Sequence, residues 1–109
     1  DERVGESSAD IRNRINSCRE IQVIRYEKHQ ISSNANMTNK MLSKYCQIGK
    51  EEASILKRAM NELSLSARAY DKILKVSRTI ADLDKSENIE MNHLLEAIQY
   101  RSLDRSLIL

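Results

Sequence analysis

The sequence predicts an all-α fold, a small bundle of about five helices, and three observations support that prediction. The chain of 109 residues has the size of a single domain. It contains no proline and only two glycines, so the residues that most often interrupt helices are scarce. Apolar residues recur at intervals of three and four, which is the spacing of a helix face that packs on a core.

The first expected helix covers about residues 8–28. Ser7 and Asp10 have the spacing of a capping box at its start. A stripe with a three-to-four step follows, and we expect it to face the core: Ile11, Ile15, Cys18, Ile21, and then either Ile24 or Arg25. The opposite face carries Arg12, Arg14, Arg19 and Glu20. We expect that face to be solvated.

Two shorter helices are expected next. Residues 31–38 are rich in Ser and Asn, which favour turns and caps, so this segment is predicted to be a loop. Thr38 is positioned to cap a short helix that contains Met41, Leu42, Tyr45 and Cys46, with Gly49 just past its end. A further helix over about 51–63 opens with two glutamates, which suit the positive end of a helix dipole.

The most apolar helix is expected over about residues 66–84, capped by either Ser64 or Ser66. Its wide apolar stripe predicts that it is the central helix; the stripe contains Ala69, Ile73, Leu74, Val76, Ile80 and Leu83. The opposite, polar stripe is Arg68, Lys72, Lys75, Thr79 and Asp82.

The last helix is expected over about residues 91–102, with Ile89 as a hydrophobic staple before it. Residues 1–6 are expected to be a linker or the cut end of a longer chain, because the sequence does not begin with Met. Residues 7–105 form the predicted helical domain, and 106–109 a tail.

No residue pattern indicates a self-contained active site or a metal site. The chain has no glycine-rich phosphate loop, and His29 and His93 are isolated from each other and from any Cys or His cluster. Cys18 and Cys46 lack metal-ligand spacing and are expected to be buried thiols. No apolar run approaches the ~20 residues of a membrane span, and we expect a cytoplasmic protein that does not bind membranes. The fragment alone is not expected to be an enzyme.

One long segment carries a family resemblance: SARAYDKILKVSRTIADLDKSENIEMNHLLEAIQYRSLDR, residues 66–105. It resembles the C-terminal lid of magnesium-chelatase-related AAA+ ATPases of the ComM/YifB group. The earlier stretches SSADIRNRI, RY and NANM resemble the start of that lid. The resemblance therefore covers about residues 7–105.

The resemblance implies a lid that closes over ATP and Mg, both held mainly by an ATPase core upstream. It implies that Arg68 is a sensor-2 arginine that contacts an ATP phosphate. The longer protein would then be a hexameric ATPase that contacts its own core domain, neighbouring subunits and DNA. For this group the implied activity is a DNA motor, linked to branch migration in natural transformation and hence to competence.

Two other interpretations stay open from the residues themselves. Arg68 on a polar stripe is also what an ordinary solvated arginine looks like. The whole chain could also be a stand-alone helical module that binds a protein, or one that binds DNA. In the second case the arginines of the first helix would contact the phosphates: Arg12, Arg14, Arg19 and Arg25.

Overall fold

The computed structural model describes residues 7–108 of the chain, with side chains described for residues 7–100. The described part contains five α-helices, one 3₁₀ turn and no strand, which confirms the predicted all-α class. The expected linker at residues 1–6 and the last residue of the expected tail lie outside the described residues. The helices are α1 (Ser8–Arg25), α2 (Asn39–Tyr45), α3 (Lys50–Glu62), α4 (Ala67–Leu83) and α5 (Met91–Ile108), with the 3₁₀ turn η2 (Asn34–Asn36) between α1 and α2.

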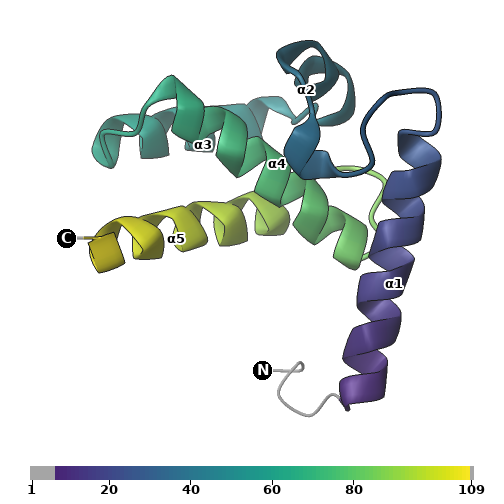
Figure 1. Cartoon of the computed structure of the whole chain (residues 1–109). Coiled ribbons are helices and arrows are strands. Elements are labelled where there is room, and N and C mark those ends of the chain that lie inside the picture. Colours follow the sequence, from purple (N-terminus) through teal and green to yellow (C-terminus); the bar gives the residue numbers. More distant parts are fainter. Residues whose placement is uncertain (1–6, 109) are drawn as a thin grey trace.

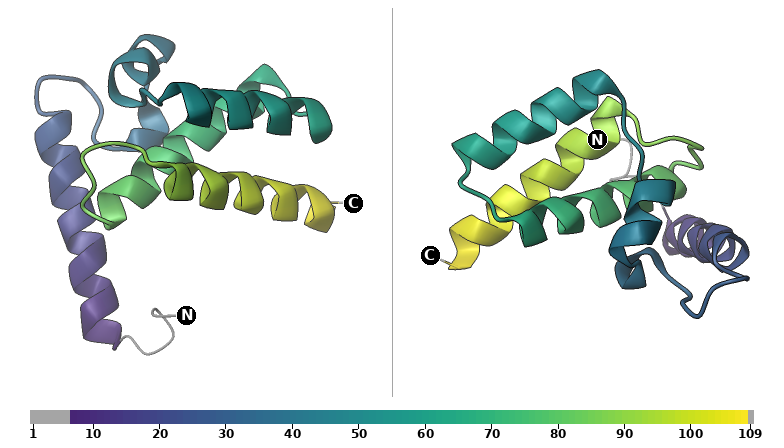
Figure 2. Two further views of the ribbon diagram at one scale, coloured as in Figure 1. Left: turned by 180° about the vertical axis from the view of Figure 1, so that it is seen from behind. Right: turned by 90° about the horizontal axis from the view of Figure 1, so that it is seen from above.

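Helix α4 lies at the centre of the bundle. It contacts α1, η2, α2 and α5, and α5 also contacts α3. Figure 1 shows α3, α4 and α5 stacked together, while α1 stands at one end of α4. In the right panel of Figure 2, α1 is seen nearly end-on beside the other helices, so it runs across the bundle and not along it.

Most helix starts are capped as the sequence predicts. The Ser7 hydroxyl accepts the Asp10 N–H at 3.1 Å, and the Thr38 hydroxyl accepts the Met41 N–H at 3.3 Å. Of the two serines considered for α4, Ser66 is the cap, accepting the Ala69 N–H at 3.2 Å. These bonds satisfy N–H groups that a helix leaves unpaired at its start.

The expected place of Gly49 was wrong. Gly49 does not end α2 in a left-handed conformation; its φ is −71°, and it is the N-cap residue of α3. The side chain of Glu52 lies where a Cβ at this position would be. The backbone at Gly49 is one that any residue can adopt, and a larger residue there would require only the flexible Glu52 side chain to move.

Two helices end in a left-handed residue that is not glycine. Ser64 follows α3 with φ 52°, and Lys85 follows α4 with φ 57°. After each, the next residue donates back to the helix, Leu65 N–H to the Met60 carbonyl at 3.0 Å and Ser86 N–H to the Ala81 carbonyl at 2.8 Å. This is the Schellman motif, so the helices stop sharply in a chain with few glycines.

The core forms around the apolar face of α4. Its buried members include Ile73, Leu74, Ile80 and Ala81 from α4, and side chains from the other helices pack on them: Tyr26, Met37, Leu42, Cys46, Leu56, Ile89, Leu94 and Ala97. Cys18 and Cys46 are buried free thiols, as expected. Burial raises the pKa of the Cys46 thiol to about 11.

The predicted buried stripe of α1 was only partly right. Ile11 and Ile15 are each 40% exposed, and Ile24 is 68% exposed. The reason is that α1 meets α4 only through its second half, and its first half extends past the bundle (Figure 1). Where α1 contacts α4, its buried residues are Cys18 and Gln22.

Helix α5 runs to Ile108, beyond the expected end at residue 102. No proline or glycine follows residue 49 in the sequence, so no residue there interrupts the helix. At the start of α5, buried His93 accepts the Glu90 N–H on Nδ1 at 2.9 Å. Its Nε2 therefore carries the proton and faces the Asp84 carboxylate at 2.9 Å. These two contacts give His93 a structural role.

No helix in the described part of the chain has the combination of length and apolar character that crossing a membrane requires.

Candidate functional site

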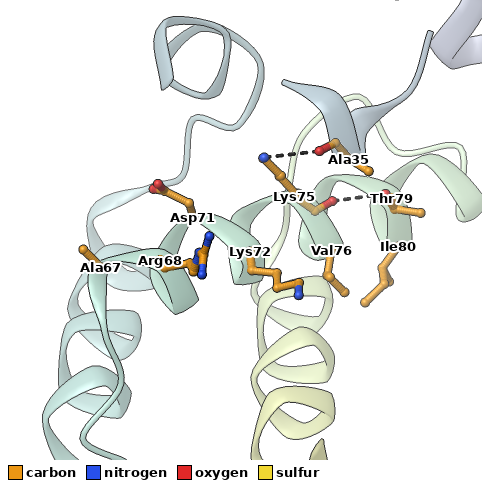
Figure 3. Close-up of a pocket in the computed structure, with 9 residues that line it drawn as sticks. All are labelled: Ala35, Ala67, Arg68, Asp71, Lys72, Lys75, Val76, Thr79 and Ile80. Carbon is orange, nitrogen blue, oxygen red and sulfur yellow. Dashed lines mark hydrogen bonds between the residues drawn. The ribbon is translucent and has the colours of Figure 1, made fainter. Parts of the chain in front are cut away.

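A groove runs along the exposed side of α4, and Arg68 lies at its beginning. Its volume is about 830 Å³, and we call it the α4 groove. It is lined by Ala35, Ala67, Arg68, Asp71, Lys72, Lys75, Val76, Thr79 and Ile80 (Figure 3). The groove collects most of the predicted polar stripe of α4, and this is where the structure places the predicted site residue Arg68.

Two rows of side chains form the α4 wall, because residues four apart on a helix share a face. The first row is Arg68, Lys72, Val76 and Ile80, so it changes from cationic to aliphatic along the helix. In Figure 3, Lys72, Val76 and Ile80 leave α4 on the same side. At 1.5 Å per residue the row extends about 18 Å. One end of the groove therefore carries two cations beside the carboxylate of Asp71, and the other end is apolar.

The second row is Asp71, Lys75 and Thr79, and its later members are held by hydrogen bonds. The Lys75 ammonium donates to the Ala35 carbonyl at 3.2 Å, and the Thr79 hydroxyl donates to the Lys75 carbonyl at 3.1 Å. Ala35 belongs to η2, which closes the groove opposite the apolar end of the first row. The groove thus has walls from two segments that are far apart in the sequence.

The cationic end is the part with unused binding capacity. Arg68 is exposed and is the second residue of α4, and neither it nor Lys72 has a hydrogen bond or ion pair within the described part of the chain. The Ala69 N–H is taken by the Ser66 cap, whereas the Ala67 and Arg68 N–H groups have no recorded partner among residues 7–108. Two free cations beside a helix start can bind an anion with several oxygens.

Asp82 was placed wrongly by the sequence. It was expected on the polar stripe opposite the buried face, but it is 1% exposed and is bonded to the buried Asn34 side chain. Arg25 binds it with two bonds of 2.7 Å, and Arg78 binds it at 3.0 Å. Hydrogen bonding to Asp82 raises the pKa of the Arg25 guanidinium above its ordinary value. The carboxylate and the two cations compensate one another's burial.

A larger polar cluster surrounds this carboxylate, and we call it the Asp82 cluster. It consists of Gln22, Arg25, Tyr26, Asn34, Arg78, Thr79 and Asp82. Arg78 also donates to the Ser86 carbonyl at 2.7 Å and the Glu87 carbonyl at 3.0 Å, which fixes the turn before α5. The cluster therefore joins α1, η2, α4 and the α4–α5 turn.

The sequence did not identify this cluster as a unit, although it contained a signal. The short stretches RY and NANM, which carried part of the family resemblance, supply Arg25, Tyr26 and Asn34, and TIADL supplies Asp82. Their partners lie up to 57 positions apart, so helical periodicity could not pair them. His29, by contrast, is exposed and contacts the Tyr45 hydroxyl at 3.0 Å.

The described residues contain no group of three or more His, Cys, Asp or Glu side chains that could hold a metal ion.

Comparison with known proteins places the chain in a family. Residues 5–101 match the family described as "Magnesium chelatase, subunit ChlI C-terminal". The competence protein ComM of Haemophilus influenzae is 44% identical over 103 residues, which is 94% of this chain and 19% of that protein. YifB of Escherichia coli is 41% identical over 104 residues, 95% of this chain and 20% of that protein. YifB of Salmonella typhimurium is 39% identical over 104 residues, with the same coverage.

The chain thus spans about a fifth of the length of these relatives, and it matches them over nearly all of its own length. The match includes both ends of the α4 groove and every member of the Asp82 cluster. On these grounds the chain belongs to the family of the C-terminal domain of the magnesium chelatase ChlI subunit.

Proposed function

We propose that this domain is the lid of a longer AAA+ ATPase and that the α4 groove faces ATP held mainly by the rest of that protein. The observation that carries the proposal is Arg68, an exposed guanidinium in the first turn of α4 at the cationic end of the groove, with no partner among the described residues. A guanidinium matches phosphate oxygens with two parallel hydrogen bonds. In this proposal Arg68 is the sensor-2 arginine and contacts the γ-phosphate.

The shape of the groove supports a nucleotide in preference to inorganic phosphate alone. Lys72 adds a second cation one turn after Arg68, while the half-buried Val76 offers an apolar surface beyond it, next to the nearly buried Ile80. Polyphosphate would lie at the cationic end and the uncharged part of the nucleotide at the apolar end. Mg would be bound with the phosphates mainly by the core domain.

The test is ATP turnover by the full-length protein carrying Arg68→Ala. One charge-assisted hydrogen bond contributes roughly 1.5–3 kcal/mol, so we expect turnover to fall about 10- to 150-fold. Arg68→Lys should restore only part of it, because an ammonium lacks the planar fork. The affinity for ATP should fall more than that for ADP, which has no γ-phosphate.

A matched control is Arg58→Ala, an exposed arginine on α3 outside the groove. It should leave turnover unchanged, and Lys72→Ala should reduce turnover much less than Arg68→Ala does. Equal turnover and ATP affinity in Arg68→Ala and the wild type, with both proteins in the same oligomer, would refute the proposal. Arg68 would then be an ordinary solvated arginine.

For the longer protein we propose an ATP-driven motor on DNA, assembled as a hexamer. The support is the similarity to a relative named as a competence protein. Branch-migration activity of the full-length protein on a four-way DNA junction, lost in Arg68→Ala, is the expected result. A reading frame with no upstream GxxxxGK[ST] motif would instead favour the stand-alone interaction module.

A further inference from the structure

The second wall of the α4 groove is a very short element that cannot hold its own position. The turn η2 has three residues, and its internal bonds are Asn36 N–H to the Ser33 carbonyl and Met37 N–H to the Asn34 carbonyl, each 3.2 Å. So short a 3₁₀ turn has little intrinsic stability. Its place against α4 must come from contacts with the rest of the domain.

Asn34 supplies most of those contacts. Its side chain is 1% exposed and uses all four of its hydrogen-bonding positions. The amide oxygen accepts from Tyr26 at 2.6 Å and Arg25 at 3.1 Å, and the amide nitrogen donates to Asp82 at 2.9 Å and Thr79 at 3.1 Å. Its backbone N–H donates to the Gln22 side chain at 2.9 Å. One residue thus ties η2 to both α1 and α4.

Ala35, the residue that follows Asn34, forms part of the groove wall. Ala35 lines the groove, and its carbonyl holds the Lys75 ammonium, as the dashed line in Figure 3 shows. Thr79 lines the groove on its outer side and bonds to Asn34 on its inner side. A shift of Asn34 would move Ala35 and release Lys75, because adjacent Cα atoms are a fixed 3.8 Å apart.

We propose that Asn34 is a positioning residue for the α4 groove: it fixes η2 against α4 and so sets the wall that would contact the uncharged part of a bound nucleotide. The ligand in this statement rests on the proposed function, whereas the positioning of η2 does not. Asn34 touches no phosphate in this scheme, since the cationic end is formed by Arg68 and Lys72.

The positioning is tested without a ligand, by hydrogen exchange of the 109-residue chain. Asn34→Ala should reduce protection of the Asn36 and Met37 amides at least about tenfold, while amides in the middle of α3 stay protected. The matched control is Asn36→Ala in the same turn, because the exposed Asn36 side chain makes a single hydrogen bond within the described structure, to the Ser33 hydroxyl at 3.3 Å. Unchanged protection in Asn34→Ala, or no protection of the turn in the wild type, would overturn the proposal.

The effect on the groove is tested by comparing ATP with inorganic tripolyphosphate in the full-length protein. Asn34→Ala should weaken ATP binding about fourfold, the change expected from losing one buried methyl contact. Tripolyphosphate binding should not weaken, since its site is the cationic end and a released Lys75 would only add a cation to the groove. Arg68→Ala should weaken both ligands. Equal weakening of both ligands by Asn34→Ala would overturn the proposal, because it would indicate a general structural defect.

The proposed function and the proposed role of Asn34 would be contradicted by different results. If Arg68→Ala changes neither ligand, the proposed function fails, and hydrogen exchange still decides the role of Asn34. If Asn34→Ala does not fold, Tyr26→Phe removes the 2.6 Å bond to the Asn34 amide oxygen and leaves the lining of the groove unchanged. That variant should show the same pattern at about a twofold scale, ATP weakened and tripolyphosphate not. Identical ATP affinity in Tyr26→Phe and the wild type would then reject the proposal.

Discussion

The two ends of α4 carry similar charged residues in opposite situations. Near its C-terminal end, Arg78 is 4% exposed and Asp82 1% exposed, and both are fully engaged with partners. In its first turns, Arg68 and Lys72 are exposed, and neither has a partner within the described part of the chain. One helix therefore uses its charges as internal connections at one end and leaves them available at the other.

Burial distinguishes the charges that stabilise the fold from the charges that are available to bind a ligand. A buried charge requires partners, because its desolvation is costly, and removing one partner exposes the other to that cost. An exposed charge contributes little to stability and is free to bind a ligand. We therefore expect substitutions at the two ends to affect different measurements, stability at one end and nucleotide turnover at the other.

The largest effect on stability should come from Asp82→Ala. It leaves the buried guanidinium of Arg78 and the partly buried one of Arg25 without their carboxylate, and losing one partner of a buried ion pair typically costs about 3–5 kcal/mol. The free energy of unfolding in urea measures it. Asp71 lies on the same helix and has no partner within residues 7–108, so Asp71→Ala should change the free energy of unfolding by less than about 0.5 kcal/mol. Similar values for the two variants would contradict the distinction between buried and exposed charges on α4.

A comparable loss is expected for Leu74→Ala in the apolar face of α4. Leu74 is 6% exposed, and large-to-small changes in a core cost about 2–5 kcal/mol. Leu95→Ala on α5 is the matched comparison, because Leu95 is 44% exposed. Urea unfolding should show a loss below about 1 kcal/mol for Leu95→Ala. A loss that small for Leu74→Ala would mean that the buried face of α4 has been assigned wrongly.

High pH should weaken the end that contains the Asp82 cluster. Burial raises the pKa of Tyr26 to about 12, and that of Cys46 to about 11. The folded state thus holds protons that the unfolded state has released, so stability should fall as pH rises from about 9 to about 12. The loss per group is on the order of 2 kcal/mol. Denaturation at several pH values measures it, and Tyr26→Phe should make the slope shallower; an unchanged slope would contradict this.

The smallest effect on stability is expected at the other end. Arg68→Ala should change the free energy of unfolding by less than about 0.5 kcal/mol, because the side chain is exposed and unpaired in the described structure. Thermal or urea unfolding of the 109-residue chain provides the measurement. A destabilisation of 2 kcal/mol or more would assign Arg68 a structural role and remove the contrast between the two ends.

Local sequence features predicted the helices well because their causes are local. Thr38 and Ser66 cap the helices that the pattern of hydroxyl residues indicated. The sequence also indicated one side of the α4 groove, because it placed Arg68, Lys72 and Lys75 on one polar stripe. Helical periodicity could not predict which side chains from different helices contact one another.

Asp82 shows this limit most clearly. By its spacing from Lys75 and Thr79 it belongs to the polar stripe, and a polar stripe is usually solvated. Its burial depends on Arg25, 57 positions earlier, and on Asn34, 48 positions earlier. The same limit explains Ile11 and Ile15, whose apolar pattern is correct for a helix but whose half of α1 has no neighbouring helix in the described structure.

The Asp82 cluster also has a consequence for how this domain can diverge during evolution. A core position such as Leu74 tolerates other aliphatic side chains of similar volume one change at a time. Arg25, Asn34 and Asp82 do not have that freedom, because replacing one leaves buried polar atoms of the other two unpaired. We therefore expect these three positions to be kept or replaced together in distant homologues, so that they form a signature that outlasts overall sequence similarity.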